Sequence, residues 1–220
     1  MANTTFNGKV RSENGFAQIT KTAATGAITE NTTIDSSGNV SAGGTLSVTG
    51  RSTLTGNTIA TTAGTGITTG TGTVYEAGVI KIGEVFHTTI LIDLTGLASS
   101  GSGDIIGKAA TANSHIGQIT AAVNGTVLGG KLTCLEAPAG GDPDINLWYA
   151  DEATGAEDAA ITSLTNQVQM CDSGDLALNS VISIPTPPAA DKYIYMATGA
   201  ATNADYTAGK ILIEFFGYSA

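Results

Sequence analysis

Residues 34–74, IDSSGNVSAGGTLSVTGRSTLTGNTIATTAGTGITTGTGTV, decide how this chain is organised. The stretch holds no aromatic residue and almost no charge, and Thr, Ser and Gly dominate it. Such a composition cannot bury enough apolar surface to fold alone. Five of its aliphatic side chains nevertheless share one parity and would point to one side of an extended strand: Ile34, Val40, Leu46, Val48 and Leu54. Identical copies that close around an axis would bury such an edge, so the stretch predicts the extended shaft of a homotrimer.

The residues before the shaft predict a small anchor module. Two Asn-Gly pairs lie in this segment beside Phe6 and Phe16, and Asn-Gly between β-prone residues is typical of a hairpin. The module is too small for a core of its own. We therefore expect Phe6 and Phe16 to anchor it to a partner, with Lys9 and Arg11 orienting the contact.

The composition changes again at Val79, where aromatic and long aliphatic residues begin. About eight short strand-like stretches follow, separated by Gly, Pro, Asn and Asp, and this pattern predicts an antiparallel β-sandwich or jelly roll. They are VIKIGEVFHTTILIDL, HIGQITA, TVLGGKLTCLEA with a bulge at Gly129-Gly130, INLWYA, NQVQMC, LNSVISIP, KYIYMAT and GKILIEFFGY. The sequence thus predicts an all-β protein with an anchor module (1–33), a shaft (34–78) and a head (79–220).

Charge is divided unevenly along the chain. Residues 1–75 contain four basic and three acidic residues, a net charge of +1, and the remainder contains five basic and sixteen acidic residues, a net charge of −11. An acidic head argues against nucleic acid or an anionic membrane as a partner. The first residues show neither the basic start nor the apolar core of a secretory signal. Cys134 and Cys171 are therefore expected to be reduced and buried, with a disulfide between them as the less favoured alternative.

No motif in the sequence indicates an enzyme. The glycines of residues 64–72 lack the flanking strand and helix of a dinucleotide fingerprint. Residues 103–108, GDIIGK, are one residue short of a phosphate-binding loop and are followed by Ala109. His87 and His115, the two histidines, show no metal-ligand spacing.

Two features near INLWYA are candidate sites. Acidic residues crowd its flanking loops and could hold a calcium ion, although solvated loops are the simpler interpretation: Asp142, Asp144, Asp151 and Glu152. Within the strand, alternation lets only one of Trp148 and Tyr149 face the core. The other is a candidate surface aromatic that packs between subunits or stacks on a sugar.

Three stretches resemble a family of virion structural proteins of tailed bacteriophages, particularly those of marine and cyanobacterial hosts. They are TTFNGKVRSENGF at the start, GNVSAGGTLSVTGRSTLTGNT in the shaft, and the head from IDLTGL through IGQITAAVNGTVLGGKLTCLEAPAGG to ILIEFFGY. The resemblance implies a trimer on the exterior of the virion, made in the host cytoplasm, and it supplies no catalytic residue.

The sequence and the resemblance together favour a homotrimeric capsid decoration protein, also called a cement protein, or a short head fibre. Its partners would be its own copies and the major capsid protein, and its role would be to stabilise the shell and to adhere to the host. The alternative is a receptor-binding tail fibre, attached to a tail component, that recognises a host surface glycan. No cofactor is expected apart from the calcium ion considered above.

Overall fold

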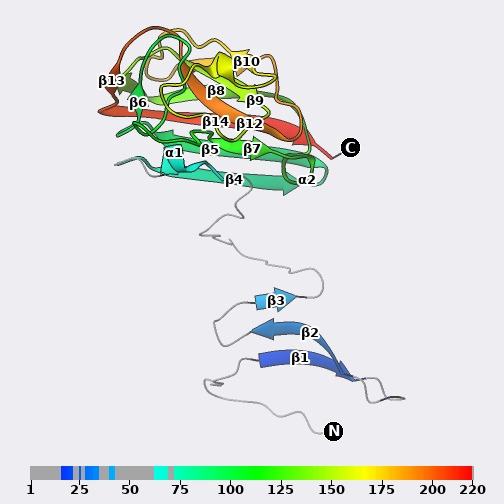
Figure 1. The fold of residues 1–220 in the computed structure, drawn as a ribbon. Coiled ribbons are helices and arrows are strands. Elements are labelled where there is room, and N and C mark those ends of the chain that lie inside the picture. The colour runs from blue at the N-terminus through cyan, green and yellow to red at the C-terminus, as the bar shows by residue number, and fades with distance from the viewer. Residues whose placement is uncertain are drawn as a thin grey trace. The chain divides into compact units, whose positions relative to one another are not determined.

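The computed structural model describes residues 16–21, 25, 28–34, 40–42, 62–68 and 72–219. The chain divides into two compact units, Met1–Leu54 and Thr55–Ala220. Antiparallel sheets make up most of the described structure and its helices are short, which confirms the predicted all-β class (Figure 1).

The described residues of the smaller unit form a three-stranded sheet in the order β1-β2-β3. The strands are β1 (Phe16–Lys21), β2 (Ile28–Ile34) and β3 (Val40–Ala42). Ile34 is the register partner of Val40, so the chain reverses between two residues that the sequence analysis placed along one extended strand. The connecting sequence DSSGN is rich in turn-forming residues, which explains the reversal.

Most of the other residues predicted for the anchor and the shaft lie outside the described part of the chain. This is the case for Phe6, Lys9 and Arg11 of the anchor and for Leu46, Val48 and Leu54 of the shaft. Phe16 is the first residue of β1, where its backbone pairs with that of Ile34. The predicted roles of all these residues stay predictions.

The larger unit, which we call the body, contains two main sheets and a two-stranded ribbon (Figure 1). The five-stranded sheet has the order β11-β8-β14-β5-β4, the four-stranded sheet has the order β10-β9-β12-β7, and β13 pairs with β6. The elements are α1 (Thr65–Thr68), β4 (Tyr75–Ile82), β5 (Val85–Asp93), β6 (Ala98–Ser99), β7 (Gly117–Ile119), α2 (Ala121–Asn124), β8 (Thr126–Ala139), β9 (Ile145–Ala150), the 3-10 turn η1 (Ile161–Ser163), β10 (Val168–Cys171), β11 (Val181–Ile184), β12 (Lys192–Thr198), β13 (Ala204–Asp205) and β14 (Ala208–Tyr218).

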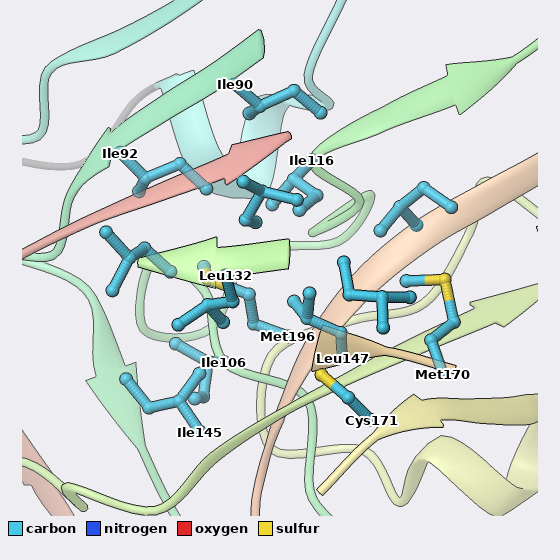
Figure 2. Close-up of a cluster of buried hydrophobic side chains, with 14 of the residues drawn as sticks. Ile90, Ile92, Ile106, Ile116, Leu132, Ile145, Leu147, Met170, Cys171 and Met196 are labelled. Atoms are coloured by element: carbon cyan, nitrogen blue, oxygen red, sulfur yellow. The ribbon is translucent and has the colours of Figure 1, made fainter. Parts of the chain in front are cut away.

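One buried cluster joins the two main sheets. It includes Ile90 and Ile92 of β5 and Leu132 of β8 from the first sheet, and Leu147 of β9 and Met196 of β12 from the second (Figure 2). In β5 every second residue from Phe86 to Ile92 is buried, as expected for a sheet with one face on a core. Cys134 and Cys171 belong to this cluster as buried thiols.

The strand β12 departs from the alternation of buried and exposed residues that is usual for a strand with one face on a core. Ile194, Tyr195 and Met196 are all buried, because a second small core covers the outer face of the strand. This core contains Ile105, Ala150, Ile161, Tyr195 and Ala197. Loops of the body contribute Ile105 and Ile161, so the middle of this strand is buried on both faces.

The body begins earlier than residue 79. Residues 75–78 are already part of β4 and pair with β5, and Ile67 of α1 is fully buried in the main cluster. The segment 62–68 is also held by hydrogen bonds, because the N–H of Gly64 donates to the carbonyl of His115 (2.8 Å) and that of Lys108 donates to the carbonyl of Gly66 (2.6 Å). This packing was hidden in the sequence because the segment is rich in glycine. Glycines let backbones approach closely but leave no apolar pattern.

The bulge predicted at Gly129-Gly130 is displaced by one residue. Phe216 pairs with Gly129 and Gly217 pairs with Val127, so Leu128 is the extra residue in β8. Gly130 instead allows β8 to approach β14 closely, because a Cβ atom at this position would lie 2.3 Å from the backbone oxygen of Glu214. A glycine is therefore needed where β8 meets β14.

Candidate functional site at the ends of strand β9

The strand β9 coincides with the predicted stretch INLWYA and carries the candidate residues at its two ends. It is a central strand, paired with β10 on one side and β12 on the other. Asp142 and Asp144 precede it, and Asp151 and Glu152 follow it. A strand of six residues spans roughly 20 Å. The two acidic pairs therefore lie too far apart to bind one ion.

Asp142 acts as a structural cross-link between loops. Its side chain is 1% exposed, and its carboxylate accepts hydrogen bonds from the N–H groups of Asp144 (3.1 Å) and Ala200 (2.9 Å). Its own N–H donates to the hydroxyl of Ser99 (3.0 Å), and its carbonyl accepts from the hydroxyl of Tyr206 (2.7 Å). Both carboxylate oxygens are thus already used to order the backbone around them.

Asp144 lies in the most acidic part of this region. Burial, followed by the neighbouring charges of Asp172, Asp142 and Asp175, raises the pKa of its carboxyl. One of its carboxylate oxygens is buried and accepts no hydrogen bond from the described residues. Ionised Asp144 is therefore a source of repulsion in the folded body.

The carboxylates at the other end of β9 are paired. Asp151 forms an ion pair with Lys192 and accepts a hydrogen bond from the side-chain amide of Asn166 (2.7 Å). Hydrogen bonds from these two groups lower the pKa of Asp151. Glu152 accepts a hydrogen bond from the N–H of Thr165 (2.8 Å), which lowers the pKa of its carboxyl. Asp151 thus fastens the 151–167 loop to β12 through Lys192, and both acids hold the two ends of the loop together.

The described residues show no group of three or more His, Cys, Asp or Glu side chains arranged to hold a metal ion. Three of the four candidate acids instead accept hydrogen bonds from protein groups, as described above. The calcium site stays a prediction with no described geometry to carry it.

Trp148 and Tyr149 point to opposite faces of β9, and both are half-buried. Tyr149 packs against the main cluster, whereas Trp148 packs against the small second core. The sequence analysis assumed that the outer face of this strand meets solvent, but the loops that bring Ile105 and Ile161 to the second core cover part of it. That one of these rings packs between subunits or stacks on a sugar stays a prediction.

A polar group on the five-stranded sheet was missed by the sequence analysis. Glu214 of β14 is 8% exposed and pairs with Lys131 of β8 (2.8 Å) and with His87 of β5 (3.0 Å). His87 in turn stacks on Phe216, with ring centroids 4.9 Å apart. The signal that could have found this region is the run Glu214-Phe215-Phe216, which places an aromatic ring on each face of one strand.

No helix in the described ranges is both long and apolar enough to cross a membrane. Comparison of the chain with protein-family models, with curated proteins and with solved structures gives no match.

Proposed function

We propose that this chain is a structural protein of a bacteriophage virion, a homotrimeric capsid decoration protein or short head fibre. The observation that carries the proposal is the division into a small, nearly neutral unit and a large, acidic body. All seven charged residues of 1–75 lie within Met1–Leu54, so that unit has a net charge of +1, and Thr55–Ala220 carries −11. The resemblance of the start, the shaft and the head to phage virion proteins supports the same assignment.

The charge division also supports a polarity of attachment. An acidic body is repelled by an acidic shell surface, whereas a nearly neutral module is not. The anchor module therefore contacts the major capsid protein through Phe6 and Phe16, while Lys9 and Arg11 orient it. The body projects outward, where it stabilises the shell and is available to the host surface.

We also propose that the body is a β-sandwich of the jelly-roll type. Its two main sheets are antiparallel and contribute to one buried cluster, which supports a two-layer arrangement. A two-layer body provides the rigid head that a short fibre needs.

A binding assay on particles stripped of this protein tests the attachment. Deletion of residues 2–16 is expected to leave a folded, soluble protein that no longer binds. The double variant Phe6→Ala, Phe16→Ala should weaken binding by several kcal/mol, the usual cost of truncating buried anchors. Full binding by the deletion variant would show that the body itself contacts the shell, and the polarity would have to be reversed.

The number of copies per purified virion distinguishes decoration from a tail location. Hundreds of copies are expected for a protein that covers the capsid, and quantitative mass spectrometry would count them. A handful of trimers per particle would instead favour the tail fibre.

A further inference from the structure

The exposed large apolar side chains of the body are concentrated on one sheet. Of ten such side chains in its described residues, eight belong to the five-stranded sheet. These eight are Ile80, Ile82, Val85, Leu128, Leu135, Val181, Phe216 and Tyr218. The other two are Val74 and Leu178.

Strand register brings most of these residues together at one end of the outer face. Ile82 is opposite Val85, which is opposite Tyr218 on the other side. In the next row, His87 lies between Ile80 and Phe216. Leu128 is the bulged residue next to Gly129, the partner of Phe216. We call the six apolar residues the apolar patch: Ile80, Ile82, Val85, Leu128, Phe216 and Tyr218.

The patch lies at the upper end of the range found on the surfaces of monomers. Its members are each 40–75% exposed, equivalent to about three fully exposed side chains. At about 200 Å² for each large side chain, this is on the order of 600 Å². The largest apolar patch on a typical monomer is about 300–600 Å², and a stable interface buries about 800 Å² on each partner. The patch therefore supplies most of the area that one partner of a stable interface buries.

Charge identifies the occupant as another copy of this chain. The strands of the five-stranded sheet carry three of the body's five basic residues and four of its sixteen acidic residues, whereas the rest of the body carries two basic and twelve acidic residues. Lys81 lies over the inner-facing Phe86, so the exposed face of the sheet carries two basic and four acidic residues, and the turn between Ile82 and Val85 adds Glu84. Two bodies therefore repel each other less through this face than through the rest of their surfaces, where the acidic excess is larger. A basic partner would be drawn to the acidic remainder instead.

The groups around the patch fit the rim of an interface. His87 stacks on Phe216 and holds Glu214, which also pairs with Lys131, so the polar row beside the patch is internally satisfied. A polar rim around an apolar centre is the usual anatomy of a subunit contact.

We propose that the apolar patch is the surface through which the bodies of identical copies contact one another around the threefold axis. This inference rests on the homotrimer in the proposed function and names the residues that close it. Each patch would meet its two neighbours and remove the exposed apolar side chains from water.

Photo-crosslinking of the full-length protein tests the contact directly. A benzophenone amino acid replaces Ile82, the most exposed member of the patch at 75%, and the same amino acid replaces Leu178 as the control at 59%. Irradiation should give a covalent species of two chains for position 82 only. Mass spectrometry of mixed heavy and light chains should place the cross-link between different copies and within β4, β5, β8 or β14.

A charge substitution tests the energetics. Ile82→Glu places a carboxylate in the contact, and Leu178→Glu adds the same charge at an exposed site outside the sheet. Sedimentation equilibrium should show that Ile82→Glu raises the concentration at which the trimer dissociates at least about tenfold, which is a hundredfold change in the trimer's dissociation constant, or about 2.7 kcal/mol per trimer. Leu178→Glu should change it less than about twofold.

The outcomes separate this inference from the proposed function. An oligomer in which position 82 forms no cross-link between copies, and in which both Glu variants behave alike, would overturn the patch and leave a trimer closed elsewhere. A monomer would overturn both the patch and the trimer. Absence of the protein from virions would refute the proposed function but not the contact, because the contact is measured on purified protein.

Discussion

Glu214 is a carboxylate kept charged on a sheet face that is otherwise rich in apolar groups. Burial alone would raise its pKa, but hydrogen bonds and charge from Lys131 and His87 outweigh burial and lower it. A lowered folded-state pKa means that ionised Glu214 stabilises the fold above the unfolded-state pKa, about 4.3. That stability is lost as the pH falls through the folded-state pKa.

We expect Glu214→Gln to lower the free energy of unfolding by about 1–2 kcal/mol at pH 7, because a charged hydrogen-bond acceptor becomes neutral. The difference from the unsubstituted protein should shrink as the pH is lowered below about 4. Urea unfolding at several pH values measures both effects. The control is Glu136→Gln, since Glu136 forms an exposed pair with Lys210 (2.5 Å) and should cost less than about 0.5 kcal/mol. Equal losses in the two variants would contradict this account.

Asp144 should behave in the opposite way, because its pKa is raised. The folded body then favours the protonated carboxyl, so ionised Asp144 opposes folding at neutral pH. Asp144→Asn is expected to raise the free energy of unfolding by less than about 1 kcal/mol at pH 7, with the gain vanishing at acid pH. The same unfolding series with a chelator and with added calcium tests the calcium prediction. Calcium-dependent stabilisation of the unsubstituted protein, lost in the Asn variant, would show that the acids bind an ion.

At the scale of elements, the two neighbouring glycines of β8 have different environments. A Cβ atom on Gly130 would overlap the backbone of Glu214, whereas one on Gly129 would have no heavy atom closer than 4.0 Å. Gly130→Ala is expected to cost about 1–3 kcal/mol through overpacking and a forced shift of the strands. Gly129→Ala should be neutral or slightly stabilising, because it restricts the unfolded chain. Thermal and urea unfolding of the two variants would reveal the difference, and similar values would contradict the close approach of β8 and β14.

Strands could be predicted where the residue types along them form a local pattern. The stretches INLWYA and GKILIEFFGY became β9 and most of β14, because β-branched and aromatic residues between turn formers favour strands. The double burial of β12 was not predictable, since loops distant in sequence cover its outer face. Packing of Ile67 was equally hidden, because a lone aliphatic among Thr and Gly carries no periodic signal. The acidic residues near β9 were found, but not partners distant in sequence, such as Ala200 for Asp142 and Lys192 for Asp151.

At the scale of the whole molecule, the start of the body can be located by truncation. A protein beginning at residue 62 retains every described residue of the buried clusters and should unfold like the body of the full chain. A protein beginning at residue 75 lacks Ala63 and Ile67 and the hydrogen bonds of Gly64 and Gly66. We expect its free energy of unfolding to be lower by about 2–5 kcal/mol, the usual cost of removing one large buried aliphatic side chain. Equal melting temperatures of the two proteins would instead place the start of the folded part of the body at or after residue 75.

The pairing of β4 in the five-stranded sheet also has a mechanical consequence. Tyr75 pairs with Ile92 at one end of β5, whereas the C-terminal residue of β14, Tyr218, pairs with Val85 at the other end. A tensile load applied between Tyr75 and Tyr218 is therefore directed along the strands and across their hydrogen bonds. Bonds loaded in this shearing geometry resist together, whereas bonds loaded in a peeling geometry break one after another. If the chain before β4 is attached to a particle and the opposite end of the body is held, a pull between the two loads the strands of the sheet in shear.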